Sequence, residues 1–135
     1  GVTTFQLQHA IDTGDILLQD RIAITENMTA GELHDIMMNV GANLLVKTLT
    51  GLIQKTIQSV PQNEVAEESQ IKHAPKIFTK DCEINWELPV QAIHNHVRGL
   101  APFPGAITKV DGKIVKSGDK RLIKGIIENG YRKFS

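Results

Sequence analysis

Apolar and polar residues alternate near the start of the chain, which predicts two β-strands joined by a loop. Val2 to Leu7 and Ile16 to Ile24 carry β-branched or apolar residues at roughly every second position. This spacing places one face of a strand on a core. The polar run Asp12-Thr13-Gly14-Asp15 separates the two segments. Because Asp bonds its own backbone readily and glycine accepts positive φ angles, the run is typical of a turn.

A long amphipathic helix is predicted after Thr29. Thr29 and Glu32 have the spacing of a capping box, in which hydroxyl and carboxylate accept from backbone N–H groups at a helix start. A mostly apolar stripe then recurs at three- and four-residue intervals, so one side of the helix should face a core. The stripe consists of Leu33, Ile36, Met37, Val40, Leu44, Leu45, Thr48 and Leu52.

The apolar pattern lapses between Ser59 and Ala74 into an acidic, polar stretch that is typical of a linker. Beyond it we predict a helix from Val90 to Arg98 and a β-hairpin from Ala106 to Lys116, turned at Asp111-Gly112. Helical spacing from Leu122 to Tyr131 predicts a short terminal helix. The predicted divisions are residues 1–58, a linker at 59–76 and a second unit at 77–135.

Composition narrows the class of protein. The 15 Lys and Arg residues balance the 15 Asp and Glu residues, so no overall basic field attracts RNA and any RNA contact needs a local patch. A basic excess from Lys109 onward is one candidate, and a solvated surface is the more ordinary explanation for it. The single cysteine, Cys82, excludes an intramolecular disulfide and fits a reducing compartment. No apolar run looks long enough to cross a bilayer, so we expect no membrane association.

Three segments carry a resemblance to a known family. One runs from Gly1-Val2-Thr3 to Ile11-Asp12-Thr13-Gly14-Asp15-Ile16-Leu17. Another joins Ala74-Pro75-Lys76-Ile77 to Ile84-Asn85-Trp86, and the last joins Arg98-Gly99-Leu100 to Pro102-Phe103-Pro104-Gly105-Ala106. In this order and spacing they resemble the methionyl-tRNA formyltransferase family. The resemblance implies an α/β fragment: the C-terminal end of a Rossmann-like catalytic domain, a linker, and a small open OB-like β-barrel.

The same resemblance implies an activity and its residues. A formyl group would pass from 10-formyltetrahydrofolate, without a metal, to the amino group of methionyl initiator tRNA in translation initiation. Asp12 matches the catalytic Asp, which would orient and charge a His at the formyl group. His9, Ala10 and Ile11 would contact the folate. The expected tRNA-phosphate ligands are Lys76, Lys80, Arg98, Lys120 and Arg121, and the expected protein is a cytoplasmic monomer.

The chain departs from the family in two places. The family's Asn and its His-Pro-Ser-Leu-Leu-Pro segment do not occur here, so we expect part of a longer enzyme that is inactive by itself. His94-Asn95-His96 does not replace them, because Val97 stands where a proline is needed. Strands of the family's barrel are missing after Lys116-Ser117, so we expect an incomplete barrel near residues 116–118.

Two alternatives stay open. The first alternative is another enzyme that uses 10-formyltetrahydrofolate, because such enzymes share the aspartate loop. They include hydrolases and the transferases that act on glycinamide ribonucleotide or on a sugar amine. The sugar-amine type is the hardest to set aside. The second alternative is a non-catalytic RNA-binding module made from the second unit. Trp86 and Phe103 could stack on a nucleotide, although the small aromatic content predicts that both anchor a core.

Overall fold

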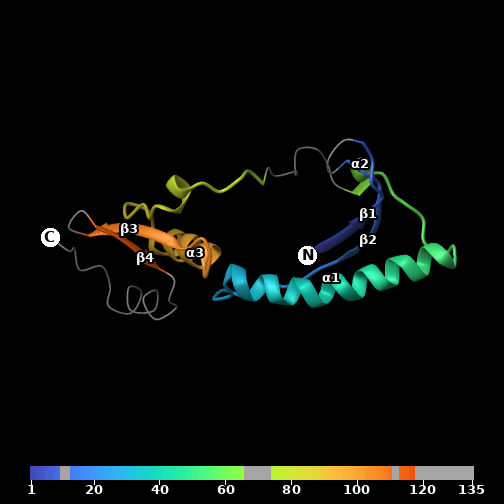
Figure 1. Cartoon of the computed structure of the whole chain (residues 1–135), viewed down its shortest axis with the longest axis horizontal. Helices are drawn as coiled ribbons and strands as arrows, with labels where there is room; N and C mark the ends of the chain where they lie inside the picture. The colour runs from blue at the N-terminus through green and yellow to red at the C-terminus, as the bar shows by residue number, and fades with distance from the viewer. Residues whose placement is uncertain (10–12, 66–73, 111–112, 118–135) are drawn as a thin grey trace. The chain divides into compact units, whose positions relative to one another are not determined.

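The computed structural model describes residues 1–9, 13–65, 74–110 and 113–117, and its elements follow the chain as drawn in Figure 1. Two compact units divide the chain. Unit 1 comprises residues 1–24 and 34–74, and unit 2 comprises residues 25–33 and 75–135. Each unit is therefore assembled from two separate stretches of sequence.

Unit 1 combines a two-stranded antiparallel sheet with a long helix. β1 (Val2–Phe5) pairs with β2 (Ile16–Asp20), so both predicted strands are confirmed, with shorter bounds. The helix α1 (Ala30–Ile53) lies in this unit except for its first turn. The Thr4 and Thr48 hydroxyl oxygens are 2.8 Å apart, and this hydrogen bond joins the sheet to the helix. Figure 1 shows β1 and β2 beside α1.

The capping box predicted at the start of α1 is confirmed. The Thr29 N–H and hydroxyl both donate to Glu32 Oε2 at 2.9 Å, and the Glu32 N–H donates to Thr29 Oγ1 at 3.3 Å. These bonds satisfy two backbone donors that a helix start leaves without intrahelical partners. Thr29 is buried, so the cap is protected from water.

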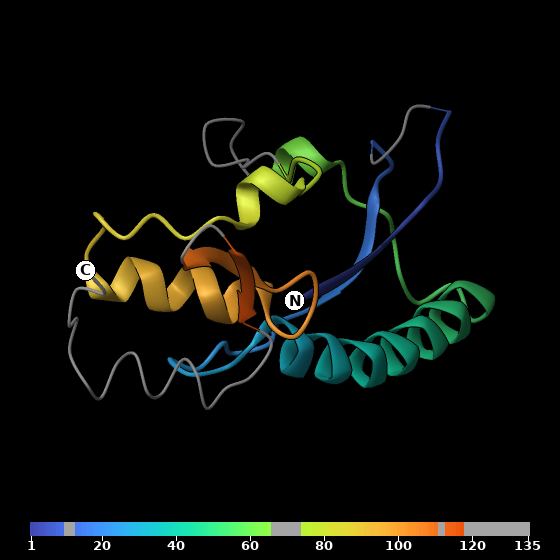
Figure 2. The same ribbon diagram turned by 60° about the vertical axis from the view of Figure 1, so that its left-hand side comes forward.

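Unit 2 packs a short helix against a β-hairpin. α3 (Val90–Leu100) contacts β3 (Ala106–Val110), which pairs antiparallel with β4 (Lys113–Ser117), and Figure 2 shows the hairpin lying across α3. The predicted helix and hairpin are thus confirmed. The 3₁₀ helix η2 (Thr79–Cys82) precedes them. The core of this unit consists of Cys82, Ile84, Ile93, Val97, Leu100, Ala106 and Ile107.

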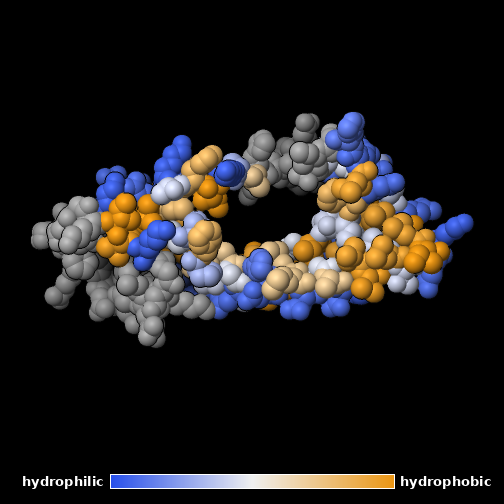
Figure 3. All heavy atoms as spheres, in the orientation of Figure 1, coloured by the Kyte–Doolittle hydropathy of each residue, from blue (hydrophilic) through white to orange (hydrophobic). Residues whose placement is uncertain are grey.

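The predicted stripe on α1 is only partly covered. Leu44 and Thr48 are buried together with Gly51, whereas Leu45 and Leu52 are exposed. Figure 3 shows hydrophobic residues along the surface of the C-terminal half of α1. The other large apolar residues exposed on this helix are Ile36, Met38, Val46, Leu49 and Ile53.

By length and composition alone, α1 is long and apolar enough to span a membrane, and 17% of its most apolar stretch is buried. The expectation that no apolar run has this length is therefore wrong. A core helix of a soluble protein satisfies the same criterion, so the finding does not argue for a membrane.

The described residues form a small α/β structure with two two-stranded antiparallel sheets. Val110 pairs with Lys113, as the predicted hairpin requires. The Asp111-Gly112 dipeptide itself lies outside the described residues, so the turn predicted there stays a prediction. The helix predicted from Leu122 to Tyr131 lies outside them as well. β4 contains Lys116 and Ser117. Residue 118 and those after it lie outside the described part of the chain, so the expectation of an incomplete barrel near residues 116–118 stays a prediction.

Candidate functional site

The loop between β1 and β2 carries the predicted catalytic and folate-binding residues. His9 is described and its side chain is exposed. Ala10, Ile11 and Asp12 lie outside the described residues, so the roles predicted for them stay predictions. What the structure does define is how both ends of this loop are held.

Hydrogen bonds close the base of the loop. Phe5 pairs with Ile16 in the sheet, and the Gln6 N–H donates to the Asp15 carbonyl at 2.9 Å. Ile16 and Val60 exchange both of their backbone hydrogen bonds at 2.8 Å. The chain entering and the chain leaving the loop are therefore tied together, and the exit is also tied to residue 60.

Gly14 is required at the loop base because the backbone passes very close to it. A Cβ atom at this position would overlap the carbonyl oxygen of Gln6. The φ angle of Gly14 is not in the left-handed region, so the conformational freedom predicted for the Asp-Thr-Gly-Asp turn is not the reason for this glycine. Close approach of two backbone segments is the reason.

The Gln62 side chain braces the same point from outside the loop. Its Nε2 donates to the Gly14 carbonyl at 2.7 Å, and Gln62 begins the short helix α2 (Gln62–Val65). Together with the Val60 bridge, this bond attaches the first part of the predicted linker to β2. Sequence reasoning missed Gln62, because a glutamine in a polar stretch carries no signal of a partner 48 residues away.

Arg98, one of the predicted tRNA ligands, is half-buried and bonded to the chain itself. Its Nε donates to Asn95 Oδ1 at 2.8 Å. Its Nη1 donates to the carbonyls of Met28 at 2.9 Å and Thr25 at 3.3 Å. The predicted contact with tRNA remains untested, whereas these contacts give Arg98 a role in the packing of unit 2.

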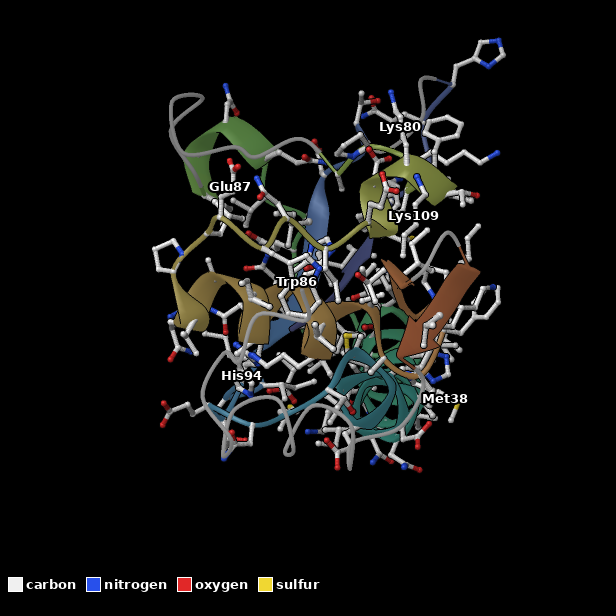
Figure 4. All side chains as sticks on the ribbon, turned by 90° about the vertical axis from the view of Figure 1, so that its left-hand side faces the viewer. Met38, Lys80, Trp86, Glu87, His94 and Lys109 are labelled. Carbon is white, nitrogen blue, oxygen red and sulfur yellow. The ribbon has the colours of Figure 1, made fainter. Side chains whose placement is uncertain are left out.

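A surface hollow of about 190 Å³ lies between η2 and the hairpin. Lys80 comes from η2 and Lys109 from β3, and Figure 4 shows both side chains at this edge of unit 2. Lys109 Nζ lies 2.8 Å from Glu83 Oε1, and this hydrogen bond and the charge of Glu83 raise the pKa of Lys109. The hollow is lined by Thr79, Lys80, Glu83, Ile107, Thr108, Lys109 and Ile114.

The other predicted basic ligands divide into described and undescribed residues. Lys76 is exposed, and its ammonium lies 5.5 Å from the centroid of the Phe78 ring, within range of a cation–π contact. Lys120 and Arg121 lie outside the described residues. Lys109 was predicted only as part of a basic excess, and its place beside Lys80 depends on the bridge between Glu83, the residue after η2, and Ile107 of β3.

Neither predicted aromatic anchor is buried. Phe103 is 84% exposed at the loop between α3 and β3, and Trp86 is 39% exposed. Trp86 Nε1 donates to Thr108 Oγ1 at 2.9 Å, which places the indole at the edge of the hairpin. The expectation that both residues anchor the core is wrong, since small aliphatic side chains and Cys82 fill that space.

The two histidines on α3 do not assemble a catalytic group. His94 Nδ1 lies 3.5 Å from Gln91 Nε2, and His96 Nε2 is buried without a hydrogen-bond partner within the described ranges. Among those residues, no group of three His, Cys, Asp or Glu side chains is placed to hold a metal ion.

Comparison with known proteins gives the class first. Residues 76–129 match the family described as formyl transferase, C-terminal domain. This match covers unit 2 from the end of the predicted linker through η2, α3 and the hairpin. This part of the chain is therefore similar to the C-terminal domain of formyltransferases.

The relatives are methionyl-tRNA formyltransferases, as the sequence motifs predicted. The enzyme of Clostridium perfringens (strain 13 / Type A) is 44% identical over 125 residues, which are 93% of this chain and 39% of that protein. The enzyme of Porphyromonas gingivalis (strain ATCC BAA-308 / W83) is 42% identical over 110 residues, 82% of this chain and 34% of that protein. The chain thus spans little more than a third of the length of these relatives.

Proposed function

We propose that this chain is the C-terminal part of a methionyl-tRNA formyltransferase, which formylates the methionine amino group of initiator tRNA with 10-formyltetrahydrofolate. The observation that carries the proposal is the 44% identity to such an enzyme across 93% of the chain. In a complete protein, residues 1–58 would end a Rossmann-like catalytic domain. Residues 77–135 would form an OB-like domain that binds tRNA.

The catalytic contribution of the chain is the loop that contains Asp12. Formyl transfer needs an amine that attacks a carbonyl, donors for the developing oxyanion, and a path for the departing proton. Asp12 would hold an imidazole from another segment in its charged form, because a nearby carboxylate favours the cation. The closed loop base and the bond from Gln62 to Gly14 support this role, since a rigid base fixes where the carboxylate is held.

The folate supplies the formyl group, and the loop ahead of Asp12 would contact its pterin. His9 is the one described residue of the three predicted contacts, and its exposed side chain is compatible with a ligand. Since this chain lacks the family's Asn and His, we expect it to show no formyl transfer by itself.

The tRNA would meet the hollow of unit 2. Lys80 and Lys109, with the hydroxyls of Thr79 and Thr108, line this hollow, and ammonium and hydroxyl groups are ordinary phosphate ligands. Glu83 neutralises part of the charge through its 2.8 Å contact with Lys109. Binding is therefore expected to be modest and to position the RNA rather than to read its sequence.

Titration of the chain with initiator tRNA over a series of salt concentrations tests the RNA-binding half of the proposal. Binding through phosphates predicts that the logarithm of the association constant falls linearly with the logarithm of salt. Absence of binding at low salt would count against a tRNA-binding role for unit 2. Binding that does not respond to salt would exclude the phosphate contacts.

A further inference from the structure

The segment ahead of α1 belongs to unit 2, although it precedes the predicted linker by some 25 residues or more in the sequence. Residues 25–33 group with residues 75–135, whereas residues on both sides of them in the chain belong to unit 1. The domain match begins only at residue 76. The structural unit is therefore larger than the matched domain, and particular contacts must hold the added segment.

The strongest of these contacts come from Arg98 near the end of α3. A turn closed by the bond from the Met28 N–H to the Thr25 carbonyl, at 3.2 Å, offers both of its carbonyls to the guanidinium. Nη1 donates to Met28 at 2.9 Å and to Thr25 at 3.3 Å. Nε donates to Asn95 at 2.8 Å, which fixes the side chain on α3.

A second contact lies one residue into α1. The Gly31 N–H donates to the Ala101 carbonyl at 3.0 Å, and a Cβ on Gly31 would lie 2.5 Å from Pro102 Cδ. This N–H is one of the donors that a helix start leaves without an intrahelical partner. The first turn of α1 is therefore bonded to, and closely packed on, the residues that follow α3.

We propose that Arg98 is a clasp that fastens residues 25–33 to the end of α3, and that it is not a ligand for RNA phosphate. A guanidinium has five N–H donors and binds a phosphate bidentately through two neighbouring nitrogens. Each such pair of nitrogens in Arg98 includes Nε or Nη1, and both of these already donate to groups of the chain. The clasp ties the predicted tRNA-binding unit to the segment that follows β2 and the Asp12 loop in sequence. The packing role of Arg98 does not rest on the proposed function, whereas the statement about RNA phosphate rests on the tRNA binding proposed for unit 2.

The test measures amide hydrogen exchange and RNA affinity on the same full chain with three substitutions. Arg98→Met removes the donors, Arg98→Lys keeps the charge without the planar fork, and Asn95→Ala removes the acceptor that fixes Nε. Lys47→Met, at an exposed lysine of α1 in unit 1, is the matched control for loss of one positive charge.

The clasp predicts that Arg98→Met and Arg98→Lys speed exchange of the Gly31 amide by about tenfold or more, as expected for loss of hydrogen bonds to a charged group. The salt dependence of RNA binding should stay unchanged in both. Unchanged exchange in Arg98→Met, or full protection in Arg98→Lys, would overturn the clasp, as would a salt slope lowered as in a phosphate contact. If Arg98→Met does not fold, Arg98→Lys and Asn95→Ala decide by the same exchange criterion.

Discussion

Gln62 Nε2 lies 2.7 Å from the carbonyl oxygen of Gly14, to which it donates a hydrogen bond across 48 residues of sequence. The bond connects α2 with the base of the loop that contains Asp12. Because the Cβ position of Gly14 is filled by the Gln6 carbonyl, the loop base is packed from two sides. Substitutions of the residues that contact the loop base should therefore disturb the loop.

Substitution of Gln62 tests the hydrogen bond that its side chain donates to the Gly14 carbonyl. Gln62→Leu should lower the free energy of unfolding of unit 1 by about 1 kcal/mol, the usual net value of a hydrogen bond of this kind. In a complete enzyme it should also lower kcat more than it changes KM for tRNA, since the loop and not unit 2 is disturbed. Chemical denaturation and steady-state kinetics measure the two effects. Gln58→Leu, at an exposed position nearby, is the control and should leave both unchanged.

Two glycines in helices of unit 2 should respond to alanine in opposite directions. A Cβ at Gly31 would meet Pro102 Cδ at 2.5 Å, whereas nothing lies within 4 Å of a Cβ at Gly99. Alanine stabilises a helix interior by roughly 0.5–1 kcal/mol relative to glycine, so Gly99→Ala should raise the melting temperature. Gly31→Ala should lower it in spite of the same propensity gain, because the proline ring must move. Equal shifts in the two variants would show that Gly31 is not tightly packed.

The ion pair between Lys109 and Glu83 in the hollow predicts that substitutions of its two members change RNA affinity in opposite directions. Lys109→Met removes a proposed phosphate ligand and should weaken binding, while Glu83→Gln removes the competing carboxylate and should strengthen it. Fluorescence titration with tRNA at fixed salt measures both. Lys47→Met, at an exposed position on α1, is the charge-matched control. Weaker binding in Glu83→Gln would mean that the carboxylate positions Lys109 rather than competing for it.

The same pair has a defined pH dependence. Glu83 raises the pKa of Lys109 above the ordinary value of 10.5. The contribution of the pair to stability is therefore fully present below pH 10.5 and is lost as the pH rises through the raised pKa. Denaturation of the wild type and of Glu83→Gln should differ by a constant amount near neutrality and converge in strong alkali. If the difference in stability instead disappeared between pH 6 and 8, where a histidine titrates, the effect would have to be assigned to a group other than Lys109.

Phe103 tests whether the exposed aromatic ring contacts RNA. With 84% of the residue exposed, Phe103→Leu should change the free energy of unfolding by less than about 0.5 kcal/mol. If the ring stacks on a base, RNA binding should weaken by about 1–3 kcal/mol. Calorimetric melting and RNA titration separate the two quantities. Lost stability with unchanged affinity would instead make Phe103 a packing residue.

Features that depend on neighbouring residues were predictable from the sequence. The Thr29–Glu32 capping box, the helix after it and the two-residue hairpin all depend on spacings of a few residues. They fix local hydrogen bonds almost independently of the rest of the chain. The resemblance of three sequence segments to one family likewise identified the relatives, because the three motifs occur in the same order and spacing as in that family.

Features that depend on distant contacts were not predictable. The bonds from Gln62 to Gly14 and from Arg98 to Met28 join residues 48 and 70 positions apart, and neither donor carries a local signal of its partner. The prediction that the aromatic residues are buried was wrong for the same reason. Trp86 and Phe103 are apolar enough for a core, but smaller side chains already fill it. Asp12 lies outside the described residues, so its predicted role rests on the motif.

The most direct measurement of the central claim is formyl transfer by the complete protein, in which the coding sequence upstream of this chain is restored. The substrates are 10-formyltetrahydrofolate with either methionyl initiator tRNA or an amino sugar, and Asp12→Asn is compared with the wild type. We predict formylation of the methionyl-tRNA that is lost by orders of magnitude in Asp12→Asn, and none by residues 1–135 alone. Formylation of the amino sugar but not of methionyl-tRNA, or full activity in Asp12→Asn, would contradict the account.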